Sequence, residues 1–509
     1  MTAREQARIA IGTLVERFLR DRTTLKNNTQ YNEANVRQEY VDPFFEALGW
    51  DIRNKDGLIQ AYRDVVTEDK VSVGGKTKAP DYAFRIGGNR VFFVEAKKPS
   101  VNIRDDQDPA FQLRRYGWSA KLPLSLLTDF EEFAIYDCRH KPNPHDKAAT
   151  CRLDYLTFEQ YLDRFDFLYD TFAKEAVLRG SLLRYAQVDA RRGTASVDDE
   201  FLAALERWRD KLAVSIRKAD QSLDEEQLTA ALQKTLDRLV FLRICEDRGL
   251  EPHNQLGEAA KARPGQTTYQ RLYDIFRKAD SKYNSGLFDL QHDPHTANLT
   301  LDDKTLQTIV GELYYPQCPY EFSVIPVEIL GHAYERFLGK VIRFTPKGLK
   351  TEEKPEVRKA GGVFYTPQYI VDYIVAQTLG PLVAGKTPEE VAQIAVLDPA
   401  CGSGSFLLGA FQYLLDWHRR WFQAHPEVLR KAKSPWKDAL LPDGNLATRI
   451  KKQILTNNIF GVDLDRNAVE VTKLSLMLKA LEGETTASVN HQLSLTSERV
   501  LPTLDYNII

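Results

Sequence analysis

The apolar positions of the first 160 residues follow two different periods. A spacing of three to four residues over 1–20, and again over 34–48, predicts two amphipathic helices. Short runs rich in β-branched and aromatic residues then predict strands at 83–86, 91–96 and 133–136. The Gly-Gly-Asn turn at 87–89 joins the first two strands as a β-hairpin. The beginning of the chain is therefore predicted to be an α/β domain.

The middle and the end of the chain have different patterns. From about 165 to 345 the apolar period is helical, most clearly over 227–248, which Gly249 closes. Prolines, glycines and basic residues from Phe344 to Gly362 predict an exposed loop or linker. After it, helices and strands alternate as in a parallel doubly wound sheet. These elements are a helix at 369–379, a strand at 394–397, a helix at 405–417, a strand at 458–462 and a helix at 466–481.

Composition excludes several classes of protein. The chain of 509 residues is 43% apolar and 28% charged, which is typical of a folded globular protein of about three domains. Its 69 basic and 71 acidic residues nearly cancel, so a nucleic-acid surface would have to be a local patch. The five cysteines show no C-x-x-C spacing, which argues against a zinc site and against disulfides and fits the cytoplasm. No signal peptide or membrane span is expected.

Two carboxylates and a lysine form the first candidate site. Asp81 opens one predicted strand of the hairpin and Glu95 ends the other, so the hairpin brings them together. Glu95 and Lys97 share one face of their strand because side chains alternate. Hard oxygen ligands of this kind bind Mg²⁺, which can activate water at a phosphodiester. The pattern is short and degenerate, and by itself it more often belongs to a hairpin that carries a surface salt bridge.

This site resembles the PD-(D/E)xK nuclease superfamily. The run Gln112-Leu113-Arg114-Arg115-Tyr116 is similar to the helical Q-x-x-x-Y element that packs beside the site in one branch of that superfamily. The resemblance implies that Asp81, Glu95 and Lys97 are catalytic and that Asp81 and Glu95 bind the metal. It also implies an extra acidic residue on an early helix, for which Glu33 and Glu39 are candidates.

A turn rich in small residues forms the second candidate site. Leu397-Asp398-Pro399-Ala400-Cys401-Gly402-Ser403-Gly404-Ser405-Phe406 follows a predicted strand and opens a helix. Small residues there let the backbone approach a ligand at the carboxyl end of the strand. Asp463 ends a second strand with a carboxylate suited to ribose hydroxyls. The turn lacks the third glycine of G-x-G-x-x-G, which disfavours a dinucleotide.

The second site resembles the S-adenosylmethionine site of gamma-type adenine-N6 DNA methyltransferases. Gly362-Val363-Phe364-Tyr365-Thr366-Pro367 is similar to the motif that covers the methionine end of the methyl donor. The resemblance implies that the donor is bound by Tyr365, Thr366, Pro367, Asp398, Pro399, Ala400, Gly402, Gly404 and Asp463. Asp465, in the same run as Asp463, could contact the donor too, but it is equally suited to cap the helix that begins near Arg466.

The methyltransferase pattern is not complete in these 509 residues. The N-P-P-Y motif that holds a flipped adenine is absent, and Ser434-Pro435-Trp436 is interpreted as a loop. The segment 504–509 resembles the approach to the next motif of the family, so we expect the sequence to be the N-terminal portion of a longer enzyme.

One further motif is interpreted as a coincidence. Gly380 to Thr387 matches G-x-x-x-x-G-K-[ST], but a phosphate-binding loop must follow a strand, and this run follows a predicted helix. Thr387 is better explained as a helix cap, and no ATP binding is expected.

Together the two sites resemble type IIG restriction-modification enzymes. The predicted domains are a PD-(D/E)xK endonuclease at 1–160, a helical connector at 161–355 and the first part of a Rossmann-like methyltransferase sheet at 356–509. The implied function is bifunctional: Mg²⁺-dependent type II cleavage of double-stranded DNA, and site-specific adenine methylation from S-adenosylmethionine.

Other interpretations stay open at this point. The chain could be a phage-defence DNA methyltransferase with an auxiliary nuclease-like domain. It could instead be a non-catalytic fragment that binds DNA or donor and needs a second chain carrying the missing motif. Phosphate contacts would then come from basic clusters at 97–98, 114–115 and 347–359. Cleavage by a homo-oligomer assembled on DNA is also compatible with the pattern.

Overall fold

The structure is a computed structural model of the chain, which divides into two compact units. Unit 1 comprises Met1–Val197 and Pro319–Ile325, and unit 2 comprises Asp198–Cys318 and Pro326–Ile509. The residues described are 1–58, 63–67, 72–73, 76–77, 80–86, 88–187, 196–283, 286–291, 293, 295–297, 299–346, 348–360, 366–431, 434–441, 444–484, 488–489 and 499–509.

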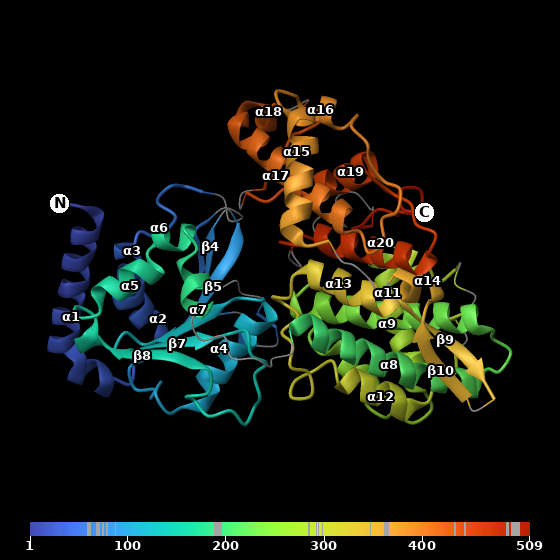
Figure 1. Cartoon of the computed structure of the whole chain (residues 1–509), viewed down its shortest axis with the longest axis horizontal. Helices are drawn as coiled ribbons and strands as arrows, with labels where there is room; N and C mark the ends of the chain where they lie inside the picture. Colours follow the sequence, from blue (N-terminus) through green and yellow to red (C-terminus); the bar gives the residue numbers. More distant parts are fainter. Residues whose placement is uncertain are drawn as a thin grey trace. The chain divides into compact units, whose positions relative to one another are not determined.

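Unit 1 is built on a six-stranded sheet (Figure 1). Its order is β1 (Val65–Thr67), β4 (Tyr82–Ile86), β5 (Asn89–Ala96), β6 (Leu124–Thr128), β7 (Glu132–Asp137) and β8 (Arg152–Thr157). β5 and β6 pair in parallel, and the other neighbours pair antiparallel. β2 (Ser72–Val73) and β3 (Lys76–Thr77) form a separate antiparallel pair. The predicted hairpin of β4 and β5 is therefore confirmed.

The helices of unit 1 are mostly short. They are α1 (Ala3–Asn27), α2 (Glu33–Val36), α3 (Asp42–Ala47), α4 (Gln107–Ser119), α5 (Phe165–Phe172), α6 (Lys174–Leu178) and α7 (Ser181–Gln187). A π-helical turn, Arg37–Val41, joins α2 to α3, and a 3-10 turn spans Phe158–Gln160. A capping box between Thr2 and Glu5 starts α1. Both predicted N-terminal helices are present, the second divided by the π-helical turn.

Strand alternation gives the sheet of unit 1 two buried faces. Phe84 and Phe92 lie opposite each other and stack with ring centroids 4.3 Å apart. They belong to the core that α1, α3 and α5 complete. Phe93 points to the other face, where it packs with Leu113 of α4. Burial on both faces explains why the β5 sequence is a nearly continuous apolar run.

The first part of unit 2 is helical, as predicted. It contains α8 (Val197–Ala219), α9 (Glu225–Asp247), α10 (Gln255–Ala260), α11 (Thr268–Tyr283), a 3-10 turn (Gly286–Phe288), α12 (Asp303–Gly311) and α13 (Val327–Leu338). A capping box at Asp224 begins α9, which is buried along most of its length. Its Arg238 is fully buried and pairs with the buried Asp293 at 2.7 Å. This pairing neutralises a charge that the interior could not otherwise hold.

The predicted linker at 344–362 is wrong over much of its length. β9 (Lys340–Thr345) and β10 (Gly348–Glu353) form an antiparallel hairpin, and α14 (Pro355–Ala360) follows. Pro346 and Gly348, with φ of +119° at the glycine, mark the tight hairpin turn and not an open linker. Proline and glycine signal a break in the chain without saying how long the break is.

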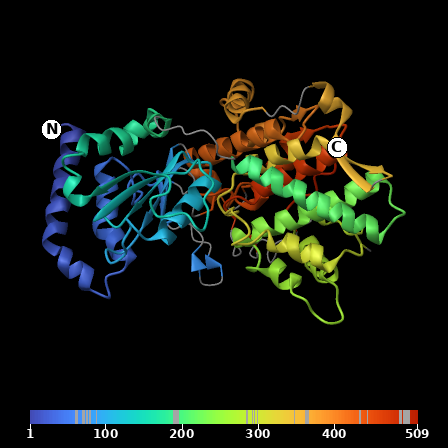
Figure 2. The ribbon, with the colours of Figure 1, turned by 60° about the horizontal axis from the view of Figure 1, so that its bottom comes forward.

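The last part of unit 2 alternates helix and strand. Figure 2 shows its helices in orange and red. Its elements are α15 (Gln368–Val383), α16 (Pro388–Val391), β11 (Val396–Asp398), α17 (Ser405–Ala424), α18 (Pro426–Arg430), α19 (Thr448–Asn458), β12 (Ile459–Gly461) and α20 (Arg466–Ala480). β11 and β12 pair in parallel, and Gly461 also forms a parallel bridge with Ile508. All five elements predicted here are confirmed.

The run from Gly380 to Thr387 lies in the helical context expected for it. Gly380 lies inside α15, and Thr387 caps α16 through a capping box with Glu390.

Among the described helices, none has both the length and the apolar character that crossing a membrane requires.

Asp237 on α9 generates a prediction about stability. Its carboxyl group accepts a hydrogen bond from Gln233 Nε2 at 2.7 Å, and burial raises its pKa to about 7. A carboxyl whose pKa is raised by folding favours the folded state below the unfolded pKa near 3.8, and this stabilisation is lost as pH rises through about 7. The variant Asp237→Asn should therefore gain stability relative to the wild type between roughly pH 4 and 7 and keep a constant advantage above that.

Urea unfolding at a series of pH values measures this difference, with Asp372→Asn on the exposed surface of α15 as the matched control. A difference between Asp237→Asn and the wild type that does not change with pH would contradict the prediction.

Candidate active sites

The β4–β5 hairpin brings the two predicted carboxylates of unit 1 together. Asp81 directly precedes β4, whose first residue Tyr82 lies opposite Val94 of β5. The backbone N–H of Ala96 donates to Asp81 Oδ2 at 2.8 Å. Asp81 thus lies against the end of β5, the strand that carries Glu95.

Glu95 is a buried carboxylate, with only 4% of its surface exposed. Its Oε1 accepts hydrogen bonds from Lys97 Nζ at 2.7 Å and from Gln112 Nε2 at 3.3 Å. Burial raises its pKa, the negative charge of Asp81 raises it further, and Lys97 opposes both effects. Its Oε2 has no hydrogen-bond partner of good geometry in the described part of the chain. Such an oxygen is a free ligand position.

Lys97 carries the compensating charge. Burial lowers its pKa, but Glu95 and then Glu33 raise it by more, and the net effect is a raised pKa. The ammonium group is therefore held in its charged form. A lysine in this state can donate hydrogen bonds to water or to a phosphate oxygen, and it is poorly suited to accept a proton.

Helix residues complete the surroundings of this site. Arg37 Nη1 pairs with Asp81 Oδ1 at 3.1 Å, and Glu33 lies 3.6 Å from Lys97 Nζ. Glu39 instead accepts a hydrogen bond from the hydroxyl of Tyr31 at 3.1 Å. Of the two acidic candidates, Glu33 is thus the one that reaches the site. Arg37 was missed by the sequence analysis, and its only signal is its i, i+4 spacing from Glu33.

The chemistry of this site suits a divalent cation. Mg²⁺ is commonly bound by one or two carboxylates together with waters and substrate phosphates, and Asp81 and Glu95 supply such a pair. The unpartnered Oε2 of Glu95 agrees with this use. No group of three or more His, Cys, Asp or Glu residues suited to a metal occurs among the residues described, so water and phosphate would have to supply the remaining ligands.

One of the basic clusters is not a surface for DNA phosphates. Arg114 is buried and pairs with Asp146 at 2.6 Å. Arg115 donates to the backbone carbonyls of Pro319 and Tyr320 and pairs with Glu321. Both guanidinium groups therefore already bind partners within unit 1.

In unit 2 the predicted donor turn connects β11 to α17. The backbone N–H of Ala400 donates to Asp398 Oδ1 at 3.1 Å, and that of Gly404 donates to the carbonyl of Cys401 at 2.8 Å. Gly402 and Gly404 have φ of +54° and +84°. This left-handed backbone is unfavourable for residues with a Cβ, which explains the two glycines.

The two glycines face different surroundings. The nearest atom to a Cβ added at Gly402 would be Glu335 Oε1 at 3.8 Å, so this side of the turn is open to a ligand. A Cβ at Gly404 would lie 2.8 Å from Thr472 Cγ2. Gly402 therefore leaves room for a ligand, whereas Gly404 allows the turn to pack against α20.

Asp463 joins the turn to the second strand. Its Oδ2 accepts the backbone N–H of Gly402 at 2.9 Å, and its Oδ1 accepts that of Asp465 at 2.8 Å. Each carboxylate oxygen keeps lone pairs for a hydroxyl of a ligand. Asp465 caps α20 by accepting the N–H of Asn467 at 3.0 Å and also pairs with Lys354. Of the two uses considered for Asp465, the structure therefore has the cap.

Two further residues hold the donor turn and were not found from the sequence. Thr472 Oγ1 donates to the carbonyl of Gly402 at 2.8 Å, and Ser403 Oγ donates to Glu335 Oε2 at 2.9 Å. Thr472 lies on α20 and Glu335 on α13, so both come from helices outside the motif. No local pattern marks a threonine or glutamate for such a use.

The covering motif is only partly described. Thr366 and Pro367 directly precede α15, which packs on α17 at Gly409, where an added Cβ would lie 2.5 Å from Val371 Cγ1. Tyr365 lies outside the described residues. Pro399 and Ala400 are exposed at the start of the donor turn.

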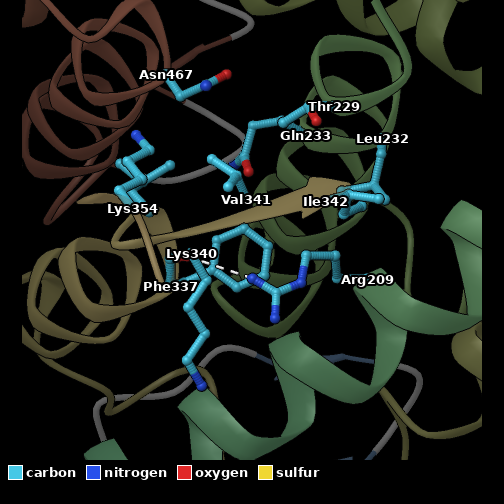
Figure 3. Close-up of a pocket in the computed structure, with 11 residues that line it drawn as sticks. Arg209, Thr229, Leu232, Gln233, Phe337, Lys340, Val341, Ile342, Lys354 and Asn467 are labelled. Atoms are coloured by element: carbon cyan, nitrogen blue, oxygen red, sulfur yellow. Dashed lines mark hydrogen bonds between the residues drawn. The ribbon is translucent and has the colours of Figure 1, made fainter. Parts of the chain in front are cut away.

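A small cavity lies elsewhere in unit 2 (Figure 3). Its volume of about 20 Å³ has room for roughly one water molecule. Arg209 lies beside the ring of Phe337 in it and donates to the Phe337 carbonyl at 3.3 Å. Its lining includes none of the described residues predicted to bind the methyl donor, so it is not part of that site.

Two family models match the chain. The model described as N-6 DNA Methylase matches residues 327–506, which include the donor turn and Asp463. The model described as Type I restriction enzyme R protein N terminus matches residues 30–144, which include Asp81, Glu95 and Lys97. The chain thus joins a region that matches the restriction-enzyme model to a region that matches the N-6 DNA methylase model.

The relatives have the same combination. The chain is 35% identical over 485 residues to the type II restriction enzyme and methyltransferase RM.Eco57I of Escherichia coli, a match that covers 95% of this chain and 47% of that protein. It is 24% identical over 593 residues to the putative type II restriction enzyme and methyltransferase RM.MjaORFECS2P of Methanocaldococcus jannaschii, covering 94% of this chain and 46% of that protein. The resemblance to combined restriction and modification enzymes is confirmed.

The matches cover only part of each relative. The chain spans about half the length of the curated relatives it matches. A cryoEM structure of a DrdV–DNA complex aligns with 92% of this chain and 38% of its own, at 14% identity and a TM-score of 0.34.

The two roles of glycine in unit 2 give a second prediction. Gly404→Ala should destabilise the chain by more than Gly385→Ala and should weaken the binding of S-adenosylmethionine. Both glycines have positive φ, of +84° and +70°, but a Cβ at Gly385 would meet nothing within 4 Å. The left-handed backbone costs about 1–2 kcal/mol at either position, and the contact with Thr472 adds about 1–3 kcal/mol at Gly404 alone.

Urea unfolding and equilibrium dialysis with labelled donor measure the two effects. Equal losses of stability for the two variants would show that Thr472 does not restrict the turn.

Proposed function

We propose that this chain contributes the endonuclease and the methyl-donor site of a bifunctional restriction-modification enzyme. The endonuclease would be Mg²⁺-dependent and would hydrolyse a phosphodiester of double-stranded DNA. The methyltransferase would transfer a methyl group from S-adenosylmethionine to an adenine amino group. The observation that carries the nuclease proposal is the convergence of Asp81, Glu95 and Lys97 at the ends of two paired strands.

The residues of unit 1 would divide the work in cleavage. Asp81 and Glu95 would hold Mg²⁺, which when bound lowers the pKa of water and offsets charge on a phosphate. The carboxylates of Glu95 and Glu33 raise the pKa of Lys97, and its ammonium group would orient water and stabilise negative charge on the phosphate oxygens. Gln112 would hold Oε1 of Glu95, so that Oε2 keeps its direction. Arg37 would fix Asp81 in the same way.

The residues of unit 2 would bind the methyl donor. Gly402 offers an open stretch of backbone at the carboxyl end of β11, where parallel sheets bind their ligands. Asp463, which already orients this turn, would accept the ribose hydroxyls of the donor. Asp398, Pro399 and Ala400 would lie along its methionine end, and Tyr365, Thr366 and Pro367 would cover it. The match of 327–506 to the adenine-N6 methylase family supports this use.

Removal of the lysine provides the third prediction. Lys97→Ala should reduce Mg²⁺-dependent cleavage of plasmid DNA by about a hundredfold or more, because the site loses the cation that faces the phosphate. Binding of S-adenosylmethionine should stay unchanged because the donor turn belongs to a different unit.

Lys147→Ala is the matched control, because Lys147 is an exposed lysine of unit 1 outside the three basic clusters and should be replaceable without effect on cleavage. Both activities are measured on the same preparations. A Lys97→Ala variant that still cleaves at the wild-type rate would rule out the assigned site.

A further inference from the structure

A short segment of the connector is built into unit 1. Residues 319–325 are separated from the rest of unit 1 by more than a hundred residues of chain, yet they cluster with it. Tyr320, Glu321 and Phe322 are nearly inaccessible, with 2%, 3% and 0% of their surface exposed. Val324 belongs to the core between α4 and the sheet. The segment is therefore an integral part of this unit.

Polar contacts fix this segment to α4. The guanidinium of Arg115 donates to the carbonyl of Tyr320 at 2.6 Å and lies 3.3 Å from Glu321 Oε2. The backbone N–H of Glu321 donates to Ser119 Oγ at 3.0 Å. The ring of Tyr320 stacks on Trp118 with centroids 5.9 Å apart. Glu321 is thus a buried charge with a dedicated partner, and an apolar residue would have filled this place at a lower desolvation cost.

The same face of α4 reaches the nuclease site. Tyr116 and Ser119 follow Gln112 by four and seven residues, so the three side chains lie in one row along the helix. At one end of the row Gln112 donates to Glu95 Oε1, and at the other end Ser119 accepts from Glu321. The helix is held by the catalytic carboxylate on one side and by the segment 319–325 on the other.

Tyr116 lies between the two ends of this row. Its side chain follows that of Gln112 by one helical turn and precedes that of Ser119 by about one more. Tyr116 itself is only 5% exposed, so the groups around it have little room to move.

We infer that Glu321 is a positioning residue of the nuclease site, acting through Arg115 and the row of α4 that carries Gln112 to orient the metal-binding carboxylate of Glu95. This inference rests on the proposed nuclease function. It assigns a role in unit 1 to a residue that lies far from the predicted nuclease domain at 1–160. The connector then supplies part of the nuclease and does not only link it to the methyltransferase.

The test is the binding of Mg²⁺ alone to the 509-residue chain, measured by titration calorimetry. Glu321→Gln keeps the shape of the side chain and removes its charge. It should weaken Mg²⁺ binding roughly tenfold, as is typical when a group that orients a metal ligand is lost. Ser119→Ala, which removes the other polar anchor of the segment, should weaken binding in the same direction.

A control separates positioning from simple loss of stability. Glu312→Gln removes a carboxylate that pairs with Lys211 at 2.6 Å in unit 2, and it should leave Mg²⁺ binding unchanged. Thermal unfolding is recorded for every variant. If Glu321→Gln lowers the unfolding temperature but binds Mg²⁺ with the wild-type affinity, its role is only structural and the inference is wrong.

A further variant distinguishes this failure from that of the proposed function. Asp81→Asn should abolish the binding of Mg²⁺ at this site. If the wild type binds no Mg²⁺, or if Asp81→Asn binds it as well as the wild type, the proposed metal site itself is wrong and the inference falls with it. If binding depends on Asp81 but is the same in Glu321→Gln and Ser119→Ala, only the inference is overturned.

Discussion

The buried carboxylate of Glu95 is the constraint on which the proposed nuclease site depends. A charge removed from water is costly unless a partner compensates it, and here a second carboxylate, Asp81, lies beside it. Lys97 at 2.7 Å from Glu95 and Arg37 at 3.1 Å from Asp81 supply the compensation. Two carboxylates and two basic groups thus meet at one end of the β4–β5 hairpin. Such an arrangement is expensive as a structural device and useful as a site for a cation and a phosphate.

The donor turn in unit 2 is organised by its backbone and not by buried charge. Two residues with positive φ bend the chain after β11, and the carboxylate of Asp463 accepts the N–H of Gly402. Thr472 holds the same residue through its carbonyl. The turn is thus fixed from α20 and from β12 while its outer side stays open. A ligand that needs close approach to the backbone would meet a preformed site there.

Patterns along the sequence were sufficient for the parts of both sites that lie on strands and on their turns. The hairpin of β4 and β5 follows from alternating side chains and a turn. The parallel pair of β11 and β12, at whose ends Gly402 and Asp463 meet, follows from the alternation of helices and strands. The contacts of Arg37 and Glu321 could not be predicted in this way. Each depends on packing between segments that no pattern in the sequence connects. The hairpin at 340–353 was missed because its proline and glycine also suit a linker.

The most direct test of the proposed metal site is an anomalous diffraction measurement on crystals of the chain grown with Mn²⁺ in place of Mg²⁺. Manganese takes the same oxygen ligands and scatters anomalously, so its position can be seen without any assay of activity. We expect an anomalous peak at coordination distance from Asp81 and from Oε2 of Glu95, the oxygen without a hydrogen-bond partner among the described residues. Crystals in which Asp81, Glu95 and Lys97 are arranged as here, but which show no peak between the two carboxylates, would contradict the assignment of a metal-dependent nuclease.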